Sequence, residues 1–116
     1  GVDSERFVAA FLRAGDYTIL ATRARVGRAE VDLIVHRDDI VAFVEVKARR
    51  DLWSGLDAVT PKKMRQLTRA ANAWLAANPS YATCSIRFDI ALVSKFHELE
   101  YLENAFEFQE DDDFVF

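Results

Sequence analysis

The stretch from residue 29 to residue 47 constrains the fold more than any other part of the chain. Residues 29–35 (AEVDLIV) and 41–47 (VAFVEVK) alternate between their two faces, and a period of two predicts β-strands. If Asp38 and Asp39 form a two-residue turn, the strands pair as an antiparallel hairpin in which the numbers of paired residues sum to 77. Asp-Asp is a weaker turn signal than Asn-Gly. A three-residue loop would shift the register by one and destroy the arrangement.

This register gathers four charged side chains on one face of the hairpin. Asp32 lies opposite Glu45 and Glu30 lies opposite Lys47, while the valines and the leucine of the two strands share the other face. Directly opposed Cβ atoms are about 4.5–5.5 Å apart, so Asp32 and Glu45 would share one hard cation. Without a cation or a proton these two carboxylates would repel each other. The alternative is a solvated face on which Glu30 and Lys47 form an ion pair and the other two acids are merely exposed.

These residue types suit the hydrolysis of a phosphodiester. A carboxylate-held Mg²⁺ orients or acidifies a water molecule and polarises the phosphoryl oxygen. Lys47 would reach the attacking water or the phosphate, and the carbonyl of Val46 would complete the metal coordination. Glu-x-Lys alone is a weak signal. An Asp, a hairpin and Glu-x-Lys within apolar strands form a moderately specific pattern.

Patterns on either side of the hairpin predict a single α/β domain, which the length of 116 residues fits. The predicted order α-β-β-β-α-β-β indicates a mixed five-stranded sheet flanked by helices. We expect this domain to occupy residues 1–106 and an acidic tail to occupy residues 107–116. The expected helices cover residues 4–14 and 61–78, and the expected strands cover residues 17–25, 29–36, 40–48, 86–93 and 99–102.

The two helices have recognisable ends. Ser4 fits the N-cap of the first helix and Gly15 its C′ position, while residues 60–61 (Thr-Pro) fit the N-cap and first position of the second. Glu5 falls on the Val8 side of the first helix, so its carboxylate would face inward. The apolar stripes comprise Phe7, Ala10, Phe11 and Ala14 on the first helix, and Met64, Leu67, Ala71, Trp74 and Leu75 on the second.

The net charge of −4 is unevenly distributed along the chain. Residues 107–116 carry five acids and no base, and the remaining residues carry 15 bases against 14 acids. Residues 23–69 carry 11 bases and 7 acids. The basic middle permits a phosphate-binding face, although an ordinary mixed surface fits the charge equally well.

Several classes of protein are excluded or disfavoured. No run approaches the roughly 18 apolar residues of a membrane span, and residues 1–5 lack the features of a signal peptide. The single cysteine, Cys84, cannot form an internal disulfide, which suits the cytoplasm. Neither a P-loop nor a dinucleotide glycine pattern is present, so we expect no nucleotide cofactor.

Basic residues outside the hairpin are further candidates for phosphate contacts. Arg49 and Arg50 would grip flanking phosphates, or they are simply solvated at a strand end. Trp53, on a polar loop, would stack on an unpaired base or pack back on the domain. The basic residues of the second helix would line the same nucleic-acid groove as Arg49 and Arg50, or they lie on a solvated helix face. They are Lys62, Lys63, Arg65 and Arg69.

Other chemically capable residues show no functional pattern. Arg87 and Asp89 are expected to pair with each other in a structural role. His36 and His97 lack metal-ligand spacing, and Cys84 has no Cys/His arrangement that would make it a nucleophile.

The chain resembles the small bacterial predicted endonucleases distantly related to archaeal Holliday junction resolvases, in the PD-(D/E)xK nuclease superfamily, which have a restriction-endonuclease-like fold. The resemblance covers nearly the whole chain apart from the acidic tail. The matching stretches are Ser4-Glu5 with Ala9-Ala10, Ile19-Leu20, Arg25, Glu30-Val31-Asp32-Leu33-Ile34, Phe43-Val44-Glu45-Val46-Lys47, Val59 with Lys63, Arg87-Phe88-Asp89, and Asn104-Ala105-Phe106.

The resemblance implies an endonuclease that depends on Mg²⁺ or Mn²⁺ and cuts DNA, with branched DNA as a suggested substrate and a homodimer as the assembly. It implies that Asp32 and Glu45 are metal ligands and Lys47 is the catalytic lysine. Glu5 would be an accessory acid, and Glu30 a neighbour in the site. Arg25, Arg49 and Lys63 are the residues that we expect to contact nucleic acid.

The chain departs from the family pattern at three places. The family usually has Gly-Glu where this chain has Ser4-Glu5 and Ala29-Glu30, and it has an Asn where this chain has Arg23. Because the acidic core is intact, these changes concern the fit of the substrate more than metal binding. The alternatives are a non-catalytic nucleic-acid-binding or scaffolding module on the same fold, and a protein-interaction domain that uses the acidic tail.

Overall fold

The computed structural model describes residues 2–51 and 59–109 of the chain. They form one α/β domain with a five-stranded mixed sheet and two α-helices, in the predicted order. The helices are α1 (Val2–Ala14) and α2 (Pro61–Ala77), followed by a short 3₁₀ helix (Pro79–Tyr81). The strands are β1 (Thr18–Val26), β2 (Ala29–Arg37), β3 (Ile40–Arg49), β4 (Ser85–Ser94) and β5 (Leu99–Phe106), and the last of these is longer than predicted.

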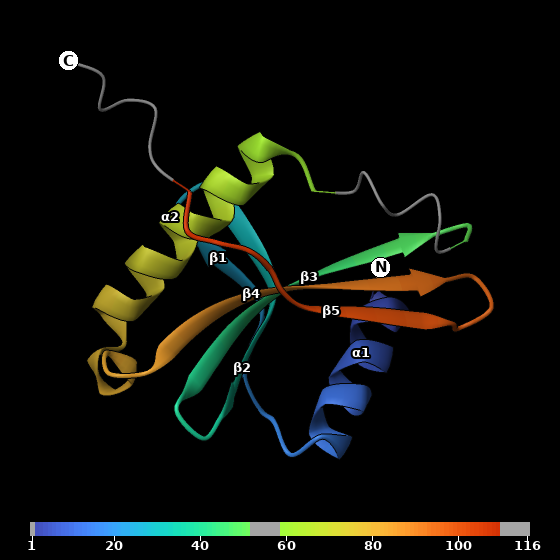
Figure 1. Cartoon of the computed structure of the whole chain (residues 1–116), viewed down its shortest axis with the longest axis horizontal. Coiled ribbons are helices and arrows are strands. Elements are labelled where there is room, and N and C mark those ends of the chain that lie inside the picture. Colours follow the sequence, from blue (N-terminus) through green and yellow to red (C-terminus); the bar gives the residue numbers. More distant parts are fainter. Residues whose placement is uncertain (1, 52–58, 110–116) are drawn as a thin grey trace.

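The sheet has the strand order β1-β2-β3-β4-β5, and only β3 and β4 pair in parallel. A parallel pair needs a crossover connection, and α2 provides it. Figure 1 shows α1 and α2 on opposite sides of the twisted sheet. Each helix therefore covers its own hydrophobic core. Leu33, Val35 and Val44 pack under α1, whereas Ile34 and Phe43 pack under α2.

The register of the β2–β3 hairpin is confirmed over its regular part. Pairing runs from Arg37 with Ile40 to Leu33 with Val44, so every pair sums to 77. Asp38 adopts a φ of 54°, which a tight two-residue hairpin turn requires and which Asp tolerates better than most residues. The ladder ends at Leu33 and Val44. Beyond this pair, the N–H of Val46 on β3 donates to the side chain of Asp32 on β2.

The prediction that Glu30 lies opposite Lys47 is therefore wrong. Glu30 pairs with Arg25 on the other neighbouring strand, β1. The regular β2–β3 ladder does not extend as far as either Glu30 or Lys47.

The alternation of side chains also breaks in this region, contrary to the sequence pattern. Val31 belongs to the core under α2, whereas Leu33, two residues later, belongs to the core under α1. The prediction that Val31 shares a face with Leu33 and Val44 is therefore wrong. The adjacent strand is irregular at the same level, where Arg23 adopts a φ of 49°.

The first helix differs from the prediction at both ends. It begins at Val2, so Ser4 lies inside its first turn instead of at the N-cap. It ends in a Schellman motif, in which the N–H of Tyr17 donates to the carbonyl of Leu12 and the N–H of Asp16 donates to that of Arg13. The left-handed C′ residue is thus Asp16, with a φ of 70°, and not Gly15 as predicted.

The buried face of α1 is rotated relative to the predicted stripe. Val8, Ala9 and Leu12 are buried, whereas Phe11 is 48% exposed. Phe11 instead packs at the rim against the ring of Tyr101. Glu5 does lie on the Val8 side, and its carboxylate faces inward as predicted, with a side-chain exposure of 14%.

The start of α2 follows the prediction. Thr60 is the N-cap, and its hydroxyl accepts a hydrogen bond of 3.2 Å from the N–H of Lys63, while Pro61 is the first helical residue. Leu67 and Ala71 are buried, as the stripe predicted, and Trp74 packs at the edge of the same core. The capped first turn fixes where Lys63 projects.

A buried polar network holds β4 and β5 together around Asp89, which pairs with Val44 of β3. Asp89 accepts hydrogen bonds from Arg87, from the hydroxyl of Tyr101 at 2.6 Å and from the N–H of Asn104 at 2.9 Å. Arg87 also donates to the hydroxyl of Tyr17 at 2.6 Å. The predicted Arg87–Asp89 pair is thus confirmed, and it joins β4 and β5 to the segment that follows α1.

Beyond β5 the described chain continues onto α2. The ring of Phe108 lies 5.2 Å from that of Phe88, and the N–H of Gln109 donates to the hydroxyl of Thr68. Most of the expected acidic tail (residues 110–116) and the loop residue Trp53 lie outside the described residues. Within the described ranges, no helix has the length and hydrophobicity needed to cross a membrane.

Candidate active site

Asp32 lies on β2 just beyond the last regular pair with β3. Its Oδ2 accepts a hydrogen bond of 2.7 Å from the backbone N–H of Val46, the residue between Glu45 and Lys47. The carboxylate therefore occupies the gap where the two strands stop pairing. This contact joins Asp32 to the Glu-x-Lys segment, but the predicted pairing of Asp32 directly opposite Glu45 is not part of the β2–β3 ladder, which ends at Leu33 and Val44.

Glu45 is the most deeply buried acid of the site, with a relative exposure of 4%. It directly follows Phe43 and Val44 on β3, which are both core residues. Two ammonium groups approach its carboxylate. Lys47 Nζ lies 3.3 Å from Oε1, and Lys63 Nζ lies 3.7 Å from Oε2.

One oxygen of Glu45 is left without a hydrogen bond. Oε2 is buried and accepts no hydrogen bond from any described group. The 3.7 Å to Lys63 Nζ is within ion-pair range but too long for a hydrogen bond. A buried carboxylate oxygen without a donor is energetically unfavourable and demands an explanation, such as a cation or a proton.

The pKa of Asp32 differs from that of an ordinary exposed aspartate. Burial, together with repulsion from Glu45, raises the pKa of Asp32 to about 6. The hydrogen bond from the Val46 N–H and the charge of Lys63 act in the opposite direction but do not cancel these effects. Two coupled carboxylates with one raised pKa are typical of a site that binds a cation or handles a proton.

Glu5 reaches this site from α1. Its Oε2 accepts a hydrogen bond of 2.8 Å from Nε of Arg23 on β1, and its charge contributes to the raised pKa of Asp32. The hydrogen bond from Arg23 to Glu5, reinforced by their opposite charges, raises the pKa of Arg23. The structure thus places Glu5 beside Asp32, but as the ion-pair partner of an arginine.

The remaining candidates lie farther from the carboxylates. Glu30 and Arg25 are exposed and face each other across β1 and β2. Arg49 is half-buried at the end of β3, where it donates to the carbonyl of Ala48 at 2.8 Å. None of these three residues contacts Asp32 or Glu45 through a hydrogen bond or an ion pair within the described ranges.

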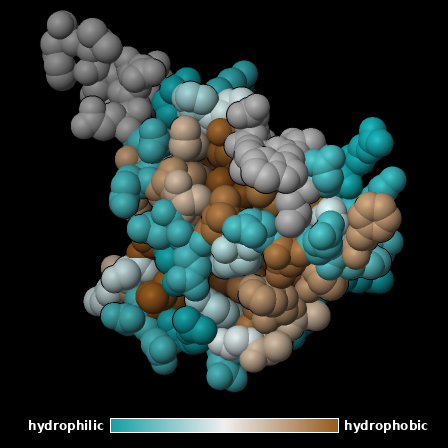
Figure 2. Space-filling view, turned by 45° about the vertical axis from the view of Figure 1, so that its right-hand side comes forward, coloured by the Kyte–Doolittle hydropathy of each residue, from teal (hydrophilic) through white to brown (hydrophobic). Residues whose placement is uncertain are grey.

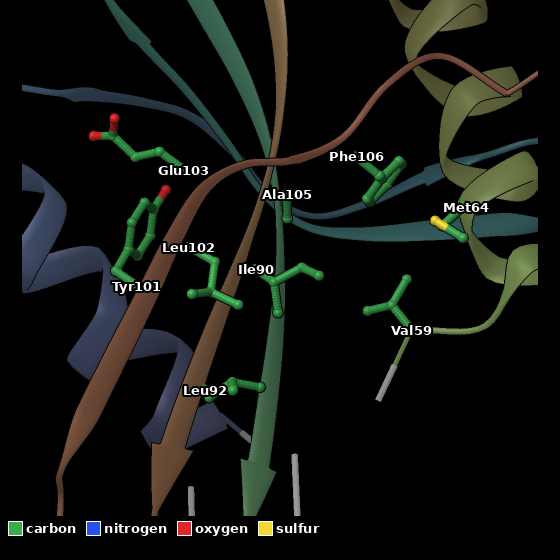
Figure 3. A pocket seen from close by; sticks show the side chains of 9 residues that line it. All are labelled: Val59, Met64, Ile90, Leu92, Tyr101, Leu102, Glu103, Ala105 and Phe106. Atoms are coloured by element: carbon green, nitrogen blue, oxygen red, sulfur yellow. The ribbon is translucent and has the colours of Figure 1, made fainter. Parts of the chain in front are cut away.

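A pocket of about 580 Å³ lies between β4, β5 and the start of α2. Its wall on β4 includes Ile90 and Leu92, which pair in parallel register with Glu45 and Lys47. Figure 3 shows these two side chains facing a space closed on the far side by Met64 of α2. Figure 2 shows hydrophobic surface between hydrophilic patches on one side of the molecule. The pocket therefore begins one strand away from Glu45, which does not itself line it.

Sequence reasoning did not assign two features of this site. Lys63 of α2 contacts Glu45 of β3, and the spacing of residues in the sequence does not predict this contact. Only the family resemblance distinguished Lys63 from the other basic residues of its helix. The sequence identified Arg23 as a departure from the family pattern, but it did not predict that Arg23 is a site residue. Its ion pair with Glu5 depends on how α1 lies against β1.

The residues present fit a divalent cation such as Mg²⁺. The fit rests on the buried Glu45 oxygen without a donor and on the raised pKa of Asp32 beside it. No group of three or more His, Cys, Asp or Glu side chains positioned to hold a metal occurs in the part of the chain that the structure describes. Mg²⁺ typically uses one or two carboxylates and completes its shell with water and substrate phosphates.

Comparison with known proteins places the chain in a family. The model of the uncharacterised protein family UPF0102 matches residues 4–93. The chain belongs to UPF0102. A UPF0102 protein of Rhodopseudomonas palustris (strain HaA2) is 42% identical over 107 residues, covering 92% of this chain and 84% of that protein. Another, of Bradyrhizobium sp. (strain ORS 278), is 46% identical over 94 residues, covering 81% of this chain and 67% of that protein.

Among solved structures, that of Pyrococcus furiosus SfsA in complex with Ca²⁺ is similar to the UPF0102 chain. The TM-score is 0.34 and the sequence identity 17%; the match covers 90% of this chain and 62% of SfsA. At this level of similarity, neither ligand nor activity is transferred. The UPF0102 description itself assigns no activity.

Proposed function

We propose that the chain is a Mg²⁺- or Mn²⁺-dependent endonuclease that hydrolyses DNA phosphodiester bonds at Asp32, Glu45 and Lys47. The observation that carries the proposal is the buried Oε2 of Glu45, which has no hydrogen-bond donor. It lies in a carboxylate that is electrostatically coupled to Asp32 and within ion-pair distance of Lys47. Such a set of groups suits a hard cation and an anionic substrate better than it suits a passive structural role.

A bound divalent cation would polarise a phosphoryl oxygen and lower the pKa of a water molecule. Asp32 and Glu45 would hold it, with the carbonyl of Val46 as a further ligand. The hydrogen bond from the Val46 N–H fixes Asp32, so that this acid is positioned before any ligand arrives. A positioned carboxylate costs no reorganisation during the reaction.

Lys47 and Lys63 would have different roles in the reaction. Lys47 Nζ, at 3.3 Å from Glu45, is partly exposed and would donate to the phosphate or to the attacking water. Lys63 Nζ approaches the other oxygen of Glu45 from α2 and would stabilise the charge that develops on the phosphate. Both ammonium groups favour an anionic substrate at this place.

A cleavage assay tests the proposal. Wild type is incubated with supercoiled plasmid and with a branched DNA in Mg²⁺ or Mn²⁺, and compared with Asp32→Asn, Glu45→Gln and Lys47→Gln. Each variant is expected to lose activity by about 100-fold or more, as is usual when a positioned charged group is removed. Glu100→Gln, an exposed acid on β5, is the control and should cut like wild type. Equal nicking by all five proteins would reject the assignment.

A second candidate is a non-catalytic nucleic-acid-binding or scaffolding module. The contacts of Lys47 and Lys63 with Glu45 favour it, because they partly neutralise this carboxylate without any metal. This candidate predicts DNA binding that depends steeply on salt, does not require a divalent ion and occurs without cleavage. The intact Asp32, Glu45 and Lys47 set favours the enzyme.

The preference for branched DNA, the homodimer and the cytoplasmic location belong to the proposal through the family resemblance alone. A symmetric dimer would present two sites to two strands. Sedimentation with and without a four-way junction would measure the assembly directly.

A further inference from the structure

A pocket of about 340 Å³ lies between α1 and β1 and carries three arginines. Arg6 and Arg13 come from α1, and Arg23 comes from β1. The acid that lines the pocket is Glu5, which is engaged with Arg23. The lining therefore has an excess of positive charge, although the chain as a whole carries −4.

The helix supplies its two arginines from one side. Positions 6, 9 and 13 are three and four residues apart, so their side chains lie in a row along α1. Ala9 is buried between the two arginines, and its small side chain lets the sheet approach. Seven residues of helix advance by about 10 Å, which is close to the rise of about three nucleotides in one DNA strand.

The irregularity of β1 supplies the third arginine. Successive strand residues normally point to opposite faces, yet both Thr22 and Arg23 line this pocket. The φ of 49° at Arg23 breaks the alternation, and Ala21 and Ala24 on either side both join the core under α2. A left-handed conformation at a residue other than glycine costs free energy, and such residues collect at functional sites.

Arg23 is held so that part of its guanidinium is available. Its Nε is bound to Glu5, and its side chain is 50% exposed. The terminal nitrogens are donors in a planar fork that suits a phosphate. Arg6 and Arg13 are exposed and form no ion pair within the part of the chain that the structure describes.

The pocket adjoins the candidate active site through Glu5. This carboxylate binds Arg23 and also acts electrostatically on Asp32. We propose that Arg6, Arg13 and Arg23 form a subsite for backbone phosphates of the DNA strand next to the phosphodiester at Asp32. The proposal rests on the proposed function and names the surface along which the substrate strand lies.

The test is DNA binding in EDTA, where no cleavage occurs. The anisotropy of a short labelled duplex is measured at increasing NaCl concentrations with wild type, Arg13→Gln, Arg6→Gln/Arg13→Gln and Arg28→Gln. Each lost phosphate contact lowers the slope of log K against log salt by about 0.9, so the double variant should lose about 1.8. Arg28 lies on the β1–β2 turn and does not line this pocket, so Arg28→Gln should keep the wild-type slope. Thermal melts confirm that the variants are folded.

Three results would overturn the subsite. They are a wild-type slope in the double variant, an equal loss in Arg28→Gln, and no binding by wild type at low salt. The outcome is separable from that of the nuclease proposal. A reduced slope without cleavage by wild type would retain the subsite and reject the enzyme. Cleavage by wild type with an unchanged slope in the double variant would retain the enzyme and reject the subsite.

Discussion

The backbone N–H of Val46 donates a 2.7 Å hydrogen bond to Oδ2 of Asp32. Asp32 is one residue beyond the last regular pair of β2 and β3, Leu33 with Val44, and Val46 is two residues beyond it. It ties the acid of one strand to the peptide between Glu45 and Lys47 on the next. The relative positions of the three candidate catalytic side chains thus depend on this single contact and on the hairpin behind it.

Replacement of Asp32 by Asn should stabilise the metal-free protein at neutral pH. The pKa of about 6 lies above the unfolded value near 3.9, so the folded state binds more protons between these values. The free energy of unfolding of wild type therefore falls as the pH rises from about 4 to about 6. Above that range, Asp32→Asn should gain about 1 to 2 kcal/mol after allowance for partial solvent screening. At about pH 4, where Asp32 is protonated, the gain should vanish.

Urea unfolding in EDTA at the two pH values measures this difference. Asp39→Asn, an exposed acid on the β2–β3 turn, is the matched control and should show neither effect. A destabilised Asp32→Asn at neutral pH would contradict the repulsion inferred at the site.

Divalent-metal binding should weaken as the pH falls through 6. A cation and a proton compete for Asp32, whose pKa of about 6 leaves it mostly protonated at lower pH. The Mn²⁺ affinity should therefore be about tenfold lower at about pH 5 than at about pH 7. Calorimetric titration in the two buffers measures it. An unchanged affinity would show that Asp32 does not bind the ion.

The network around Asp89 should be essential for stability but not for chemistry. Asp89 is fully buried and neutralises Arg87, so Asp89→Asn leaves a largely buried guanidinium with only the exposed Glu103, at 3.9 Å, as a counter-charge. We expect a loss of about 3 to 5 kcal/mol. Tyr101→Phe removes one 2.6 Å hydrogen bond to Asp89 and should cost about 1 to 2 kcal/mol. Thermal and urea unfolding test both, and a neutral Asp89→Asn would contradict the role of the pair.

Thr60→Ala should shorten or loosen the first turn of α2. The Thr60 hydroxyl accepts the hydrogen bond from the Lys63 N–H, and the loss of such a cap costs about 0.5 to 2 kcal/mol. Thr60→Ser retains the hydroxyl and should behave like wild type. Comparison of the two by thermal melting isolates the cap, and equal melting temperatures would show that the cap does not stabilise the helix.

The sequence was sufficient for the architecture and for the hairpin register. The alternation of β2 and β3 and a two-residue turn leave one register that buries the apolar face. The structure has this register from the pair Arg37–Ile40 to the pair Leu33–Val44. The Thr60-Pro61 start of α2 was equally readable, because capping acts between residues close in sequence. Local chemistry therefore determined these features.

Features that depend on tertiary contacts were missed. The break of alternation at Asp32 accompanies a left-handed Arg23, and residue type alone does not predict that conformation for arginine. The hydrogen-bond partners of the Arg87–Asp89 pair also come from other parts of the chain: Tyr17 accepts from Arg87, and Tyr101 donates to Asp89. The shift of the first helix end from Gly15 to Asp16 reflects a motif in which either residue fits.

The most direct test of the account is a calorimetric Mn²⁺ titration of wild type, Asp32→Asn and Glu45→Gln, each with and without a short branched DNA. The DNA is included because substrate phosphates complete the coordination of such ions. We predict saturable binding by wild type that tightens with DNA and is lost in both variants. Equal, negligible binding by all three proteins would contradict the metal site and leave Asp32 and Glu45 as parts of a non-catalytic surface.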